Sequence, residues 1–79
     1  MTVPLRSAIV IQWSDADETY LVTLPEWSER YPNPVTHGGS YQDALANAIE
    51  ILTRFVDIAI ERAEPLPPPA SATPTISVV

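Results

Sequence analysis

The longest amphipathic segment of the chain runs from Ser40 to Glu64 and reads SYQDALANAIEILTRFVDIAIERAE. At about 100° per residue, its apolar side chains fall on one stripe and its charged side chains lie opposite. Ser40, with Asp43 three residues later, is typical of a helix N-cap with an acidic first turn. Since Pro65 cannot continue a helix, the sequence predicts one long helix over residues 41–64. Its stripe comprises Tyr41, Leu45, Ala48, Ile49, Leu52, Phe55, Val56, Ala59 and Ala63.

Two further isoleucines, Ile51 and Ile58, lie seven residues apart on one flank of this stripe. They widen the apolar arc beyond what one face of a small sheet should cover. We therefore expect both side chains to be partly exposed in a monomer and to contribute to a helix-mediated dimer interface. The alternative is that they are ordinary core residues.

Two short strands are expected before the helix. Residues 7–13 and 19–24 are rich in β-branched and aromatic side chains that alternate between two faces. The polar residues 14–18 between them are typical of a hairpin turn. Residues 26–39 lack a clear period, and we expect a short third strand there, around residues 35–37.

The C-terminal part of the sequence is expected to be extended. Residues 65–69 are proline-rich and favour polyproline II, whereas residues 70–75 are small and polar. The last residues have strand composition, and a terminal strand must pair with an edge of its own sheet or of another chain's. Ile76 and Val78 are therefore candidate interface residues. We predict one domain over residues 1–69 and a flexible segment over 70–79 that ends in this strand.

The charge balance suggests a kind of partner. Asp and Glu together number 10 against 4 Arg and no Lys, so the net charge is −6. Four scattered arginines do not form a basic patch, so direct binding to nucleic acid is not expected, whereas a basic protein would be attracted. The absence of Cys fits a reducing compartment, and no segment has the composition of a membrane span or a leader peptide. We expect a cytoplasmic protein.

No residue pattern indicates catalysis. A nucleophile needs a base beside it and a third group that orients the base, and the chain has one histidine, His37, and no Cys. Asp15, Asp17 and Glu18 resemble the beginning of a calcium loop but lack its glycine and its bidentate glutamate. We therefore predict that the protein is not an enzyme and has no catalytic residues, metal or cofactor.

Trp27 and Tyr31 lie in the segment without a clear period. Aromatic side chains with a polar tip are enriched in interface hot spots, so both are candidate interface residues. A local core role beneath their own loop is the alternative.

Several short motifs follow one another in a characteristic order. They are Tyr20 at the start of the second strand, Leu24-Pro25-Glu26-Trp27 followed by Arg30, Val35-Thr36-His37-Gly38, Ser40-Tyr41-Gln42-Asp43-Ala44-Leu45 with Ala48, and Glu64-Pro65-Leu66-Pro67. No single motif is diagnostic. Their order and spacing, from Ser7 to about Pro69, resemble the HicB family of type II antitoxins, in particular its small single-domain members.

The resemblance implies an α+β fold, a partly degraded ribonuclease H-like β-β-β-α-β chain in which a small antiparallel sheet packs on one long helix. It also implies binding without catalysis. Members of the family dimerise or form higher oligomers and bind the cognate HicA toxin, a small basic mRNA interferase, whose active site they cover. The expected partners are therefore a HicA-like toxin and further copies of this chain, as a dimer or tetramer.

The sequence departs from the family pattern in two places. Many members carry a C-terminal helix-turn-helix or ribbon-helix-helix domain that binds their own promoter, and no basic segment of this kind precedes Val79. The loop from Trp27 to Pro34 is longer than the common short form.

Two other functions are considered. One is a solitary, homo-oligomeric HicB-like domain that binds a small molecule or an unrelated protein. The other is a metal-dependent nuclease, which is disfavoured because three of the carboxylates share a single loop.

Overall fold

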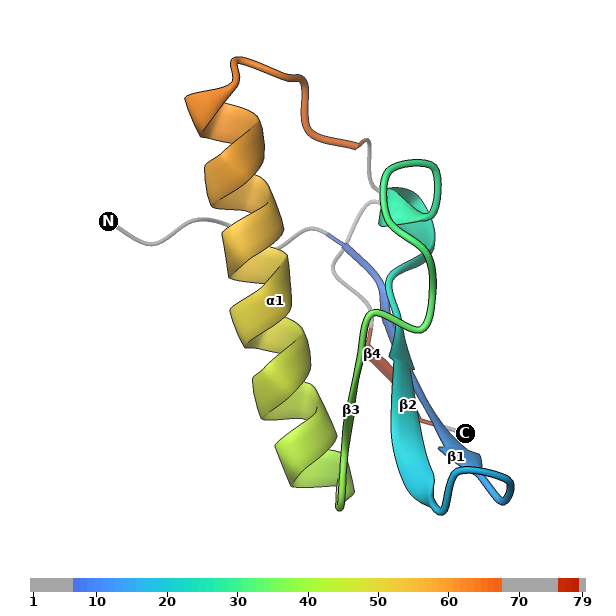
Figure 1. Cartoon of the computed structure of the whole chain (residues 1–79). Coiled ribbons are helices and arrows are strands. Elements are labelled where there is room, and N and C mark those ends of the chain that lie inside the picture. The colour runs from blue at the N-terminus through green and yellow to red at the C-terminus, as the bar shows by residue number, and fades with distance from the viewer. Residues whose placement is uncertain (1–6, 68–75, 79) are drawn as a thin grey trace.

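The computed structural model describes residues 7–67 and 76–78 of the 79-residue chain. In chain order its elements are strands β1 (Ile9–Ser14) and β2 (Thr19–Thr23), the 3-10 helix η1 (Pro25–Trp27), strand β3 (Thr36–Gly38), helix α1 (Tyr41–Glu61) and strand β4 (Ile76–Val78). The strands form one sheet in the order β3-β2-β1-β4, and α1 lies across one face of it (Figure 1). The α+β class is confirmed, with three antiparallel strands packed against one long helix.

The sequence predicts an antiparallel sheet, but the observed sheet is mixed. Strand β4 pairs parallel to β1. The chain leaves the far end of α1 and returns to the sheet beside its first strand. The third strand begins one residue later than predicted, at Thr36, although the backbone N–H of Val35 already donates to the carbonyl oxygen of Val22 at 2.9 Å. The predicted domain boundary at residue 69 and residues 70–75 of the predicted flexible segment lie outside the described residues.

The hairpin of β1 and β2 supplies one side of the core. Alternation along each strand turns Ile9 and Ile11 of β1 and Val22 of β2 toward the helix, where all three are buried. Ile11 and Val22 are directly paired across the two strands. The predicted hairpin is thus confirmed, and its apolar face is the one that α1 covers.

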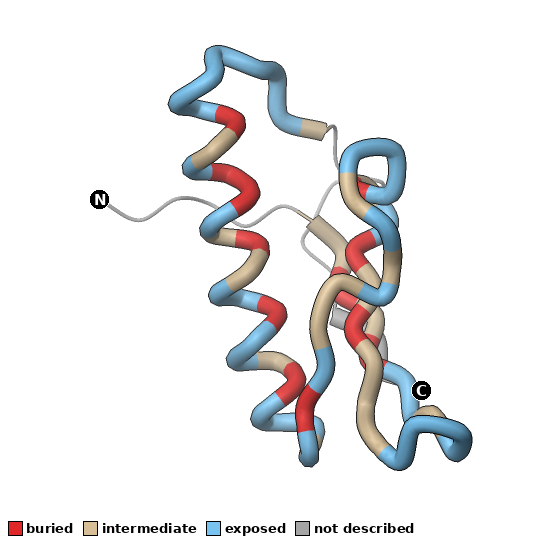
Figure 2. The backbone as a smooth tube through the Cα atoms, viewed as in Figure 1, coloured by how far each residue is buried: buried red, intermediate tan, exposed pale blue. Residues whose placement is uncertain are grey.

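Helix α1 begins as the sequence predicts. The hydroxyl oxygen of Ser40 accepts a hydrogen bond from the backbone N–H of Asp43 at 3.1 Å, which satisfies one of the free amides of the first turn. Figure 2 shows the buried positions of the helix aligned along the side that faces the sheet. They are Ala44, Ala48, Leu52, Phe55, Val56 and Ala59.

The helix is rotated relative to the predicted stripe. Ile49, which the periodicity placed on the buried side, is 39% exposed, whereas Ala44 is fully buried in its place. The reason lies in strand β3, where Gly38 packs directly against the first turn of α1. The small side chain of Ala44 allows this close approach, whereas the large buried side chains Leu52, Phe55 and Val56 lie further along the helix.

The helix ends three residues before the predicted position. Ala63 adopts a left-handed conformation, with φ of 55°. Its N–H donates to the carbonyl of Ile60 at 3.1 Å, and the N–H of Glu64 donates to the carbonyl of Ala59 at 2.8 Å. This pair of hydrogen bonds is a Schellman motif, which usually has glycine at the left-handed position. With alanine there, the sequence carries no signal for the end.

Neither α1 nor any other helix within the described residues combines the length and the apolar character needed to cross a lipid bilayer.

Candidate partner-binding surfaces

Trp27, a candidate interface residue, is part of the core. Its side chain is only 1% exposed, and its indole N–H donates to the hydroxyl of Ser7 at 3.1 Å. The ring centroid lies 5.5 Å from that of Phe55 on α1. Of the two roles open from the sequence, the local core role is the one that the structure shows for Trp27.

The loop after η1 is fixed to the helix by aromatic contacts. Tyr31 stacks on Phe55 with a centroid distance of 3.8 Å and an interplanar angle of 4°, and its side chain stays partly exposed. Arg30 lies over the ring of Trp27 at 5.2 Å and donates from Nη2 to the carbonyl oxygen of Pro65. Arg30 therefore joins the loop to the segment that follows the helix, while part of Tyr31 remains available for contact.

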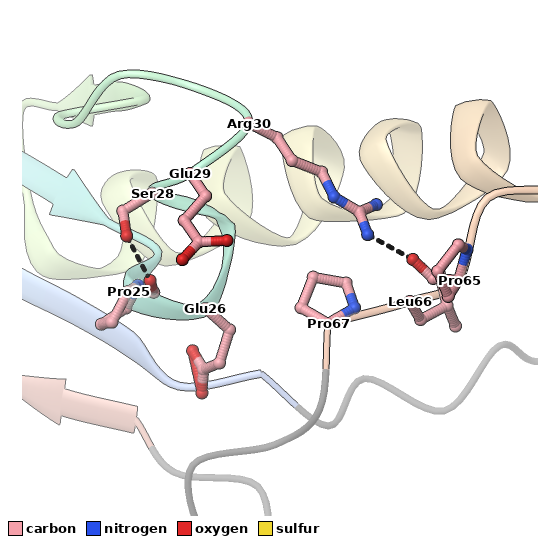
Figure 3. A pocket seen from close by; sticks show the side chains of 8 residues that line it. All are labelled: Pro25, Glu26, Ser28, Glu29, Arg30, Pro65, Leu66 and Pro67. Carbon is pink, nitrogen blue, oxygen red and sulfur yellow. Dashed lines mark hydrogen bonds between the residues drawn. The ribbon is translucent and has the colours of Figure 1, made fainter.

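A groove of about 450 Å³ separates these two segments (Figure 3). One side is lined by Pro25, Glu26, Ser28, Glu29 and Arg30, and the other by residues 65–67. The Glu26 carboxylate accepts hydrogen bonds from the backbone N–H of Ala8 at 2.9 and 3.2 Å, so this acid also holds the start of β1. Prolines and the exposed Leu66 lie on its walls together with the charged side chains of Glu26, Glu29 and Arg30.

Ile51 and Ile58 are both partly exposed on α1, and Ile51 packs against the core. The most exposed isoleucines lie on the opposite flank of the helix, where Ile49 is accompanied by Ile60 at 60% exposure. The sequence pattern had placed Ile49 inside the core. Both flanks of α1 therefore carry apolar side chains, and the flank with Ile49 and Ile60 is the more accessible.

Strand β4 lies at one edge of the sheet. Ile76 is paired with Ile9 and Val78 with Ile11, so the predicted terminal strand is present and uses the edge of its own sheet. The side chains of Ile76 and Val78 lie outside what the structure describes. The second edge of β4 carries no further strand among the described residues.

The acidic residues of the hairpin turn stabilise the turn itself. Asp15 accepts a hydrogen bond from the indole N–H of Trp13 at 2.6 Å, and Asp17 accepts one from the hydroxyl of Ser14 at 3.1 Å. His37 is exposed on β3, on the sheet face opposite the helix. In the described part of the chain, no three Asp, Glu or His side chains converge as a metal ion would require.

An aromatic triad, Trp13, Tyr20 and Tyr41, was not singled out from the sequence. Trp13 and Tyr20 are paired across the hairpin, with ring centroids 5.0 Å apart, and Tyr20 lies 4.3 Å from Tyr41 at the start of α1. The hairpin register alone could have brought the first two together. The contact with Tyr41 required the packing of the helix.

Models of known protein families, curated proteins and solved structures yield no match to this chain. The function is therefore inferred from the geometry and the sequence of the chain itself.

Proposed function

We propose that this protein is a HicB-like antitoxin that binds a HicA-like mRNA interferase and covers its active site without catalysing a reaction. The observation that carries the proposal is the path of the chain. Three antiparallel strands are followed by a helix across one face, and a last strand then returns parallel to β1. This β-β-β-α-β order is the one that a partly degraded ribonuclease H-like fold requires.

The motifs that carry the resemblance have clear structural roles. Leu24 and Trp27 are buried, Gly38 packs on α1, and Ser40 caps that helix. Each is needed for the fold rather than for contact with a partner. These four residues support membership of a fold family, and the partner must be recognised by exposed residues.

The distribution of charge supports a basic partner. Asp15, Asp17 and Glu18 lie on the exposed hairpin turn, and Glu50 and Asp57 lie on the exposed side of α1. Carboxylates spread over separate surfaces attract a cationic protein, whereas metal-dependent nuclease chemistry needs them to converge. The same surfaces disfavour direct binding to RNA or DNA.

Self-association is the second part of the proposal. A chain of this size buries a modest fraction of its surface, and α1 leaves Ile49 and Ile60 in contact with solvent. We infer that a second copy of the chain covers this flank in a dimer, which can assemble further into a tetramer.

The proposed function is tested with a small basic HicA-like protein whose gene lies next to the gene of this chain. The purified chain should suppress the toxin's mRNA cleavage at stoichiometric concentration. An unrelated basic ribonuclease serves as the control and should remain active. Association with the toxin should slow as the Debye length falls from about 10 Å to about 3 Å.

Two results would overturn the antitoxin function. One is undiminished toxin activity, and the other is equal suppression of the unrelated ribonuclease. Undiminished activity with an oligomeric chain would favour the solitary domain instead.

A further inference from the structure

The aromatic triad forms an exposed surface beyond the end of the aliphatic core. Trp13 is 45% exposed and Tyr41 is 43% exposed, and Tyr20 lies between them in contact with both rings. Trp13 and Tyr20 meet edge to face, with an interplanar angle of 66°. Exposed Trp and Tyr side chains that pack against one another are enriched in interface hot spots. They offer a large contact area and lose little conformational entropy on binding.

Two carboxylates belong to the hairpin turn next to this surface. Asp15 holds the indole of Trp13 by its hydrogen bond, and Glu18 belongs to the same turn. Asp43 lies in the first turn of α1 but two residues after Tyr41, so its side chain is on another face of the helix. Figure 1 shows that the hairpin turn and the start of α1 lie at the same end of the molecule. Neither the hairpin, residues 7–24, nor the first three turns of α1, residues 41–51, contain an Arg or Lys. The triad is therefore an aromatic surface in a negative field.

This combination matches the chemistry of a guanidinium group. The face of an indole or phenol ring attracts a cation, and an adjacent carboxylate accepts its N–H groups. Arginine suits the site better than lysine, because its planar group can stack on a ring while it donates to a carboxylate. A nucleobase could stack on the same rings, but its phosphates would be repelled by Asp15 and Glu18.

We propose that the aromatic triad docks an arginine side chain of a basic protein partner. The identity of that partner as the toxin rests on the proposed function, whereas the chemistry of the surface does not. The guanidinium lies over the exposed ring of Trp13 or Tyr41 and donates to the carboxylates of the turn. The motif residues of the core hold the triad in place without touching the partner.

The first test uses an acetylated and amidated peptide that contains arginine and glycine, titrated into the full chain. Nuclear magnetic resonance should show shifts of the Trp13 indole N–H and of the Tyr20 and Tyr41 rings. The indole N–H of Trp27 is an internal control, because it is buried and bound to Ser7. A matched peptide with neutral citrulline in place of arginine should leave the Trp13 resonance unchanged.

Variants of the chain define the surface further. Trp13→Ala and Tyr41→Ala should each weaken peptide binding about three- to tenfold, the loss expected for one cation–π contact. The pair Asp15→Asn and Glu18→Gln should weaken binding, whereas Glu50→Gln and Asp57→Asn, also exposed, should not.

The proposal is overturned if the citrulline peptide binds as well as the arginine peptide. It is also overturned if the arginine peptide shifts resonances near every exposed carboxylate but leaves the Trp13 indole resonance unchanged. Stronger binding of a short uridine oligoribonucleotide at the triad would likewise contradict it. Toxin inhibition, measured separately from peptide binding, distinguishes a wrong docking surface from a wrong proposed function. If Trp13→Ala inhibits the toxin as well as the original chain does, the docking surface is wrong and the antitoxin function stands. If the peptide binds at the triad but the chain does not inhibit the toxin, the docking surface stands and the antitoxin function is wrong.

Discussion

Gly38 of β3 lies directly against the backbone of Ala44 in the first turn of α1. A Cβ atom on Gly38 would be 2.3 Å from the nitrogen of Ala44 and 2.6 Å from its Cα atom. Backbone atoms cannot move aside as the end of a flexible side chain can. This contact sets the distance between the sheet and the helix, and it explains why the helix turns small side chains toward β3.

Gly38→Ala should therefore lower the free energy of unfolding, by about 1–3 kcal/mol or more, because the helix must shift away from β3. Gly39→Ala is the matched control. A Cβ at Gly39 meets nothing within 4 Å, and its φ is not positive, so this change should be neutral or slightly stabilising. Urea unfolding followed by circular dichroism measures both. Equal stability of the two variants would contradict the close packing.

Ala63→Gly should stabilise the protein. Ala63 holds the left-handed position of the Schellman motif, which costs an L-residue about 1–2 kcal/mol and glycine much less. After the larger entropy loss of glycine, we expect a net gain of about 0.5–1 kcal/mol, measured as a rise in Tm. Ala46→Gly, at an exposed position inside the same helix, should instead lower stability by about 1 kcal/mol. A destabilised Ala63→Gly variant would show that the helix ends elsewhere.

The parts of the fold that could be predicted from the sequence depend on local patterns. The hairpin follows from alternation, and the start of α1 follows from the capping serine at Ser40. The end of α1 could not be predicted, because Ala63 carries no signal for a left-handed residue. The exposure of Ile49 could not be predicted either, because it depends on a packing contact between Gly38 of β3 and Ala44 of the following helix.

The same distinction applies to the candidate surfaces. Trp27 lies in a segment without a period, so its side chain could be assigned to the core only once Phe55 and Ser7 were seen around it. Trp13 and Tyr20 follow from the hairpin register, but Tyr41 joins them only through tertiary packing.

The two tryptophans should respond differently to truncation. Trp27→Ala removes a fully buried ring and should cost about 3–5 kcal/mol, a large share of the stability of so small a domain. Trp13→Ala should cost much less, because nearly half of that side chain is already exposed. Thermal unfolding by far-ultraviolet circular dichroism compares them. In Trp13→Phe, the remaining emission from Trp27 should resist quenching by acrylamide, and efficient quenching would contradict its burial.

Replacement of both Ile49 and Ile60 by Glu should convert an oligomer into a folded monomer, as measured by light scattering with helix content retained. The physical reason is that each exposed isoleucine buried in a dimer is worth about 1.5–3 kcal/mol, and charged side chains would remove that gain. The matched double variant, Ile51→Glu with Ile58→Glu, should lower stability, because Ile51 packs against the core. If that second variant is instead a folded monomer and the first stays oligomeric, the interface lies on the flank of Ile51 and Ile58. If both stay oligomeric, neither flank of α1 is the interface, and two copies are expected to pair along the edge of β4 that carries no strand among residues 7–67.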